Sequence, residues 1–307
     1  MTLIISCITA DFVVQASDRR VTVPGQGRGD DRANKAIFYC GQSAWAYTGI
    51  AQIGAMRTDE WLVDHFYQHD KLQEAMTGMA KRLDGAMARL SHPREAKRLA
   101  VVGVGFARFP QAGHQPYLAW VSDSLDPPHA WRARPRTAFA AHISHLPADR
   151  SFAIASYGQR LPAEGLAELR RAVQRVLDHG SGPIAVARLT TELIQAVAAT
   201  NQAVGDNVMC MILTRDGVTP GNPSIRTLPI PLVPGASHAD RFRVFNDYAG
   251  EPICTYIPGN PEAVLFYGPM SVCKDVAMWA GAFGPTQALA SLPSGNPFPP
   301  YSLSFLR

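Results

Sequence analysis

TLIISCITADFVVQASDRR, residues 2–20, is the stretch that decides the fold class of this chain. Residues 2–9 are rich in β-branched side chains, Ala10 and Asp11 are typical of a turn, and an apolar run resumes at Phe12. This pattern predicts a β-hairpin with strands at 2–9 and 12–16. A chain that opens with a hairpin favours packed antiparallel sheets over a βαβ winding.

Outward from this hairpin, groups of short strands alternate with pairs of helices up to residue 216. The helices are predicted by apolar residues at helical spacing, and the strands by short apolar runs between Gly, Pro and Asp. The predicted elements are strands at 36–40 and 44–48, helices at 50–68 and 72–90, strands at 99–107, 117–121 and 152–155, helices at 162–177 and 184–200, and a strand at 208–214. This order predicts an α+β sandwich of two packed sheets covered by helices, with residues 1–216 as one domain.

Residues 217–307 have a different composition, because more than half of the 24 prolines fall there. The same segment contains many aromatic and aliphatic residues, which is not typical of a disordered tail. We therefore expect an irregular Pro-rich extension that packs on the core or on a neighbouring subunit, with a helix at 272–280. The segment 263–267, between Pro261 and Pro269, is a candidate to cover an open strand edge.

The overall composition is that of a folded cytoplasmic protein, with 47% hydrophobic and 18% charged residues. No apolar run is long enough for a membrane span, and the N-terminus lacks the basic leader of a signal peptide. Five widely spaced cysteines with no CxxC pair indicate buried thiols, and the nine histidines show no metal-binding spacing, so we expect no metal and no cofactor.

The net charge of +4 is too small to indicate nucleic-acid binding. Its densest basic cluster consists of Arg132, Arg134 and Arg136. Three arginines around a proline are typical of a solvated loop, and the alternative is that they guide an acidic partner.

Thr2 carries the chemistry that the sequence suggests most strongly. Removal of Met1 leaves a threonine with a hydroxyl and a free α-amine on the same residue. The α-amine, with an unperturbed pKa near ~8, can take the hydroxyl proton as the oxygen attacks a carbonyl. A small residue after the initiator methionine is common, so this position alone is weak evidence.

Further residues at defined distances from Thr2 strengthen the hypothesis. Asp18 and Arg20 end the first hairpin, Lys35 precedes the next strand, and Thr48-Gly49 leads out of the fourth strand. In this order the chain resembles the proteasome β-subunit and HslV-like family of N-terminal nucleophile (Ntn) hydrolases. The resemblance spans residues 2–215 in element order and implies a four-layer αββα sandwich, a threonine-type peptidase and a homo-oligomeric ring.

Carried over residue by residue, the resemblance makes Thr2 the nucleophile, Asp18 and Lys35 its charged partners, and the Gly49 N–H the oxyanion donor, with Arg20 in a supporting role. Taken singly, Lys35 has the alternative interpretation of a surface lysine, Asp18 that of a turn cap and Gly49 that of a turn glycine.

The chain departs from the family pattern at the positions that support the terminal amine. Active members place an aspartate and a serine after the last long helix, where this chain has Asn201 and Val204. Ser156 is the candidate for the family's serine in the preceding loop, and Asp206 is a possible substitute for the missing acid. The expected function is a threonine amide hydrolase acting on peptides; the alternatives are a small-molecule amidohydrolase or acylase, and a non-catalytic subunit that keeps Met1.

Overall fold

The computed structural model describes residues 2–21, 35–39, 43–67, 69, 71–91, 94–109, 113–127, 130–215, 252–257 and 260–267. It is a mixed α and β structure whose two main sheets are antiparallel throughout. Within these residues, no helix is both long enough and apolar enough to cross a bilayer.

The first sheet has six strands in the order β12-β1-β2-β13-β15-β14. Its central hairpin, β1 and β2, pairs Ile4 with Ser17 and Ile8 with Val13, as a tight antiparallel turn requires. The strands are β1 (Leu3–Thr9), β2 (Phe12–Asp18), β12 (Phe152–Gly158), β13 (Val208–Thr214), β14 (Pro252–Ile257) and β15 (Asn260–Tyr267).

The second sheet has five strands in the order β11-β8-β7-β4-β3. Two short strand pairs accompany it, β5 with β6 and β9 with β10. The strands are β3 (Ala36–Tyr39), β4 (Ser43–Gly49), β5 (Gln52–Ile53), β6 (Met56–Arg57), β7 (Leu99–Phe109), β8 (Gly113–Ser122), β9 (Leu125–Asp126), β10 (Ala130–Trp131) and β11 (Ala140–His145).

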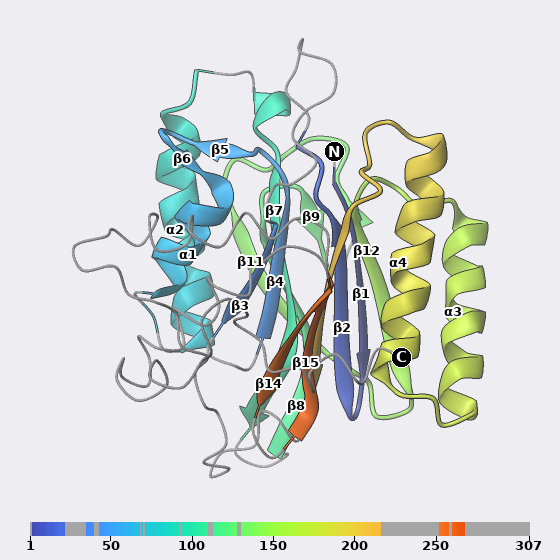
Figure 1. Ribbon diagram of the computed structural model, residues 1–307. Coiled ribbons are helices and arrows are strands. Elements are labelled where there is room, and N and C mark those ends of the chain that lie inside the picture. The colour runs from blue at the N-terminus through green and yellow to red at the C-terminus, as the bar shows by residue number, and fades with distance from the viewer. Residues whose placement is uncertain are drawn as a thin grey trace, which may run out of the picture.

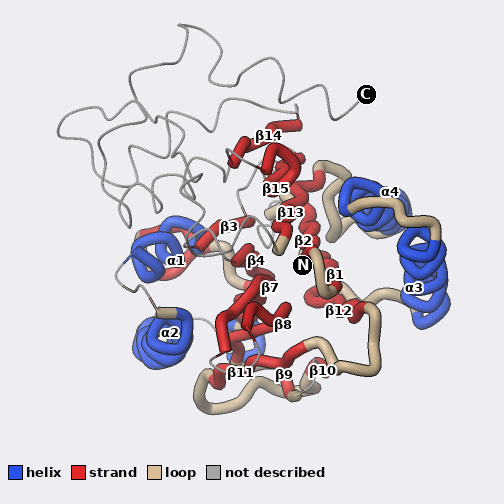
Figure 2. Tube along the Cα trace, turned by 90° about the horizontal axis from the view of Figure 1, so that it is seen from below, coloured by secondary structure: helices blue, strands red, loops and turns tan. Residues whose placement is uncertain are grey.

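Helices flank the two sheets on opposite sides, as Figures 1 and 2 show. On one side lie α1 (Thr58–Tyr67) and α2 (Leu72–Ala88), and on the other α3 (Ala163–Asp178) and α4 (Pro183–Thr200). A short 3₁₀ helix, η1 (Arg94–Lys97), precedes β7.

The burial of β1 explains why its sequence is apolar on both faces. Ile4 and Ile8 belong to a cluster between the two sheets. Leu3 and Ile5 belong to a second cluster, between the six-stranded sheet and helices α3 and α4. A third cluster lies between the five-stranded sheet and helices α1 and α2. Successive side chains on a strand point to opposite faces, so a strand packed on both faces needs a continuous apolar run.

The predicted order of the main helices and strands up to residue 215 is confirmed. The short pair β9–β10 and the 3₁₀ helix η1 were not predicted, and two further differences concern α1 and β11. The helix predicted from residue 50 begins only at Thr58, because residues 52–57 form the pair β5–β6 around Gly54, which has a φ of 62°. Strand β11 was not predicted. It lies at a sheet edge, where its partly exposed side chains leave no apolar alternation in the sequence.

The C-terminal extension contains regular structure, so the prediction that it is irregular is wrong for residues 252–257 and 260–267. These form β14 and β15, and Phe266 and Tyr267 pair with Met211 and Cys210 of β13. Residues 263–267 lie within β15, whose last two residues pair with β13, while the predicted helix at 272–280 lies outside the described residues.

Truncation after Asp216 is expected to leave the edge of β13 open and to produce aggregated protein. An edge strand with unpaired N–H and C=O groups is a template for pairing with other chains. Size-exclusion chromatography of the full-length and truncated chains is the measurement. A truncated chain that elutes as a soluble species in the full-length oligomeric state would show that β15 is dispensable.

Candidate functional site

Thr2 lies at one end of the interface between the two sheets, just before β1. Its carbonyl oxygen accepts hydrogen bonds from the N–H of Gln159 at 2.8 Å and from Oγ1 of Thr48 at 3.3 Å. Gln159 follows β12, and Thr48 belongs to β4 of the other sheet. Two sheets therefore hold this residue, and only 4% of its surface is exposed.

Lys35 reaches Thr2 from the residue before β3. Its Nζ lies 2.5 Å from Thr2 Oγ1 and 3.5 Å from Asp18 Oδ1, and it also donates to the carbonyl oxygen of Arg20. A lysine ammonium has three N–H donors and no acceptor. The three oxygens match these donors, so the charged form of Lys35 is fully satisfied although its side chain is only 2% exposed.

Burial changes the protonation chemistry of Lys35. Desolvation lowers its pKa from 10.5 to about 8; the charge of Asp18 opposes this shift, and the neighbouring Arg19 and Arg20 reinforce it. A lysine with this pKa keeps much of its positive charge near neutral pH and loses it at mildly alkaline pH. The group beside Thr2 Oγ1 therefore titrates in an accessible pH range.

Asp18 organises the backbone around Lys35. Its Oδ2 accepts the N–H of Leu3 at 2.6 Å, and its Oδ1 accepts the N–H groups of Arg20 at 2.9 Å and Gly205 at 3.1 Å. A carboxylate with no exposed surface needs such partners to offset its desolvation. Asp18 thus connects the first residues of β1, the end of β2 and the 201–206 loop.

Arg20 also binds the 201–206 loop, through its guanidinium group. Its Nη1 donates to the carbonyl oxygens of Gln202 at 2.9 Å and Val204 at 2.8 Å. Its Nη2 lies 3.9 Å from Oδ1 of Asp206, whose side chain is 72% exposed. Asp206 therefore pairs with Arg20 and faces solvent, an arrangement that differs from the one expected of a substitute acid at Thr2.

Asn201 and Ser156 are not brought to Thr2 Oγ1. Asn201 ends α4, and its Oδ1 accepts the N–H of Ala203 at 2.9 Å, which makes it a helix-end turn residue. Ser156 pairs with Ile5 across β12 and β1, on the face that packs against α3 and α4. Thr2 shares the alternation of Ile4, which faces the other sheet. Val204 is buried in the cluster beneath α3 and α4.

Gly49 ends β4 next to Thr48 and has a φ of 116°. A Cβ atom at this position would lie 2.0 Å from the carbonyl oxygen of Arg98, so only glycine fits. The role of its N–H as an oxyanion donor stays a prediction.

Gly158 is a site residue that the sequence did not indicate. Its φ is 83°, and a Cβ atom there would lie 1.8 Å from the carbonyl oxygen of Thr2 and 2.6 Å from Oγ1 of Thr48. Because Gly158 has no side chain, the carbonyl oxygen of Thr2 can lie between the end of β12 and Thr48 of β4. A glycine at a strand end gives no sign in the sequence of what packs against it.

Replacing Gly158 with alanine is expected to lower the free energy of unfolding by about 3 kcal/mol and to displace Thr2. The positive φ costs about 1–2 kcal/mol, and the clash adds an overpacking cost of about 1–3 kcal/mol. Gly180→Ala is the matched control, because Gly180 has a φ of 68° with no atom within 4 Å of the added Cβ. Urea denaturation compares them, and equal losses would contradict the proposed contact with Thr2.

No metal site is evident in the part of the chain that the structure describes, where no group of three His, Cys, Asp or Glu side chains is placed to hold an ion. The cysteines described there, Cys7 and Cys210, are buried free thiols, and burial raises the pKa of each to about 12.

Comparisons with known proteins give a distant likeness. No model of a protein family matches the chain, and no curated protein sequence matches it. Solved structures do match, and one of them is described as Anbu (ancestral beta-subunit) from Yersinia bercovieri. It has 13% sequence identity and a TM-score of 0.43, over 70% of this chain and 81% of its own.

Proposed function

We propose that this protein is a threonine-type amide hydrolase of the Ntn class, activated by removal of Met1, with peptides as substrates. The observation that carries the proposal is the contact between Lys35 Nζ and Thr2 Oγ1 at 2.5 Å, with both side chains buried. A nucleophile whose oxygen touches a cation in a site shielded from water is poised to develop negative charge.

The same proposal assigns the chain to the four-layer αββα sandwich of that class. The three hydrophobic clusters support it, because one lies between the sheets and the others lie between each sheet and its helix pair. The homo-oligomeric ring remains an expectation from the resemblance, and sedimentation velocity of the purified protein tests it.

In the proposed reaction, the α-amine released by loss of Met1 accepts the proton of Thr2 Oγ1, and the oxygen attacks the amide carbon. Lys35, donating to that oxygen, stabilises its developing negative charge, while Asp18 keeps the lysine charged and in place. The N–H of Gly49 is the proposed donor to the carbonyl oxygen of the substrate. Collapse of the intermediate transfers the proton to the leaving amine, and water then hydrolyses the ester on Thr2.

Two measurements test the function directly. The intact mass of the purified protein is expected to lack Met1, and an epoxyketone or β-lactone probe is expected to add to Thr2, as located by peptide mapping. A panel of peptides and acylated small amides then identifies the substrate class. Retention of Met1 on all molecules after expression in a cytosol with normal processing would refute the catalytic proposal and favour a non-catalytic subunit.

The pH dependence of kcat/KM is expected to be bell-shaped with its maximum near pH 8. Below the maximum the α-amine, with an unperturbed pKa near ~8, becomes protonated and cannot accept the hydroxyl proton. Above it, Lys35 loses its positive charge, because burial places its pKa at about 8 instead of 10.5. Asp18→Asn removes the carboxylate that raises this pKa and is expected to move the alkaline limb to lower pH. A rate that stays constant from pH 8 to 10 would contradict the expected loss, in this range, of a Lys35 charge that the reaction needs.

A further inference from the structure

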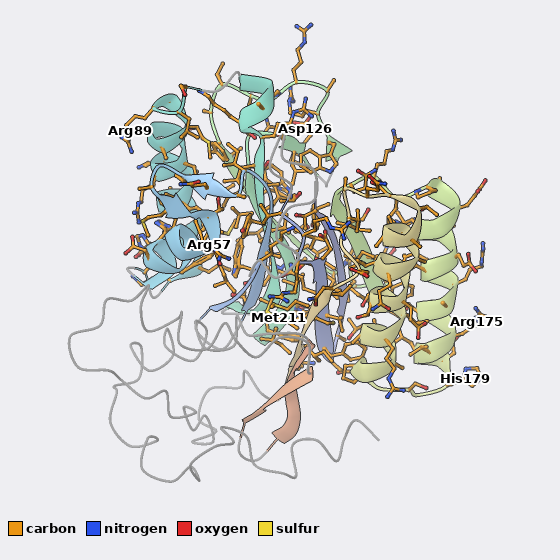
Figure 3. The ribbon with its side chains drawn as sticks, turned by 45° about the horizontal axis from the view of Figure 1, so that its top comes forward. Arg57, Arg89, Asp126, Arg175, His179 and Met211 are labelled. Carbon is orange, nitrogen blue, oxygen red and sulfur yellow. The ribbon has the colours of Figure 1, made fainter. Side chains whose placement is uncertain are left out.

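A group of four arginines lies at the end of the molecule where Thr2 is found. This arginine rim consists of Arg98 before β7 and of Arg132, Arg134 and Arg136 in the segment between β10 and β11. Arg98 Nη2 donates to the carbonyl oxygen of Ala133, which ties the two parts together. Figure 1 shows the N-terminus near the upper end of the molecule. Figure 3 shows Asp126, which binds Arg132, near the upper end as well, whereas His179 lies near the lower end.

The rim is directly connected to the candidate site. The carbonyl oxygen of Arg98 accepts the N–H of Ile50 at 3.1 Å and lies against Gly49, where it would be 2.0 Å from an added Cβ. Gly49 follows Thr48, whose Oγ1 donates to the carbonyl oxygen of Thr2. Only the end of β4 therefore separates Arg98 from the nucleophile.

The positive charge of the rim is only partly neutralised. Asp126 binds Arg132 at 2.8 Å and also Arg136, and its hydrogen bond to Arg132 leads the effects that hold the pKa of its carboxyl below the usual value. Within the described residues, neither Arg98 nor Arg134 forms an ion pair with an acid. The guanidinium groups of Arg98 and Arg134, at the same end of the molecule as Thr2, thus remain available to an anion.

The other acid of this region is already engaged in the fold. Asp123 is 4% exposed; its Oδ1 accepts the hydroxyl of Ser124 at 2.7 Å and the N–H of Leu99 at 3.5 Å. Arg160 follows Gln159, whose N–H binds the carbonyl oxygen of Thr2, and is exposed. The exposed acid described near Thr2, Asp206, is paired with Arg20 at 3.9 Å.

We propose that the substrate carries one or more carboxylates close to the amide that Thr2 attacks, so that acidic peptides are preferred over neutral and basic ones. This inference rests on the proposed function and assigns Arg98 and Arg134 as specificity-determining residues. An arginine guanidinium pairs with a carboxylate through two parallel hydrogen bonds, and an electropositive mouth raises the local concentration of an anionic ligand. Arg132 and Arg136 form ion pairs with Asp126. We therefore expect them to add to the positive electrostatic potential and not to contact the substrate carboxylate directly.

The experiment measures binding separately from turnover. Three fluorescent hexapeptide amides, which carry two Glu, two Gln or two Lys in an alanine background, are titrated by anisotropy against the Thr2→Ala variant at 50 and 300 mM NaCl. The acidic peptide is expected to bind roughly fivefold to tenfold more tightly than the Gln peptide at low salt, and the preference is expected to shrink at high salt. Equal affinities of the three peptides would overturn the proposal.

Arg98→Gln with Arg134→Gln is expected to remove this preference while leaving the affinity for the Gln peptide unchanged. The matched control is Arg150→Gln, which removes an exposed arginine from the loop between β11 and β12 at the opposite end of the sheets. If Arg150→Gln removed the preference for the acidic peptide to the same extent, the preference would depend on the net charge of the protein alone. Arg98 and Arg134 would then not be specificity-determining residues. If the wild-type protein cleaves none of the peptides while the Thr2→Ala variant still prefers the acidic one, the proposed function fails and the binding site stands.

Discussion

Thr2→Ala is expected to reduce the rate of amide hydrolysis by at least about 10³-fold, because it removes the attacking oxygen itself. The fold should be retained, since a small residue is replaced and no large cavity opens. The buried Lys35 Nζ loses one of its three acceptors, at a cost of about 1 kcal/mol in stability. Peptide hydrolysis and thermal unfolding, measured on the same preparation, separate the two effects.

Thr2→Ser is the companion variant. Serine carries its hydroxyl on Cβ, as threonine does, so the distance from the α-amine is the same. The variant is expected to retain part of the activity and to react covalently with the epoxyketone or β-lactone probe. Hydrolysis by Thr2→Ala at the wild-type rate would show that another residue is the nucleophile.

Lys35→Ala is expected to lower kcat/KM by about 10²- to 10³-fold, the loss typical when one donor to a developing oxyanion is removed. The variant takes away the only cation that an observed hydrogen bond joins to Thr2 Oγ1 among the described residues, and leaves the buried Asp18 without its lysine. Some loss of stability is therefore also expected, and circular dichroism identifies the temperature range in which the variant is folded. The rate comparison is made within that range.

Lys35→Arg should not restore the activity, because a planar guanidinium is bulkier than an ammonium and does not fit three acceptors placed around one nitrogen. Lys71→Ala is the control: Lys71 precedes α2, and its exposed Nζ donates to Oε1 of Glu74 at 2.9 Å, in an ion pair that involves neither Thr2 nor Asp18. Unchanged turnover in Lys35→Ala would remove the lysine from the mechanism.

The sequence alone determined the elements whose signals are local. The hairpin of residues 2–18 follows from its β-branched runs and its turn, and an antiparallel hairpin brings its two ends together. Thr2 and Asp18 were therefore bound to be neighbours once the hairpin formed, and the hydrogen bond from Leu3 to Asp18 is the result. The helix pairs followed from their apolar periodicity, since a helix packed on one face shows that face in the sequence.

Tertiary structure alone decided which distant residues meet at Thr2. Lys35 reaches Thr2 Oγ1 only because the two sheets pack face to face, and no local pattern encodes that contact. Ser156 shows the opposite outcome: a shift of one residue along a strand moves a side chain to the other face, so an approximate alignment cannot place it. Gly158 could not be predicted as a site residue from the sequence. Its role is to leave space for the carbonyl oxygen of Thr2, which is distant in the sequence. Sequence periodicity reports which face of an element is buried, whereas contacts across the interface depend on register and packing.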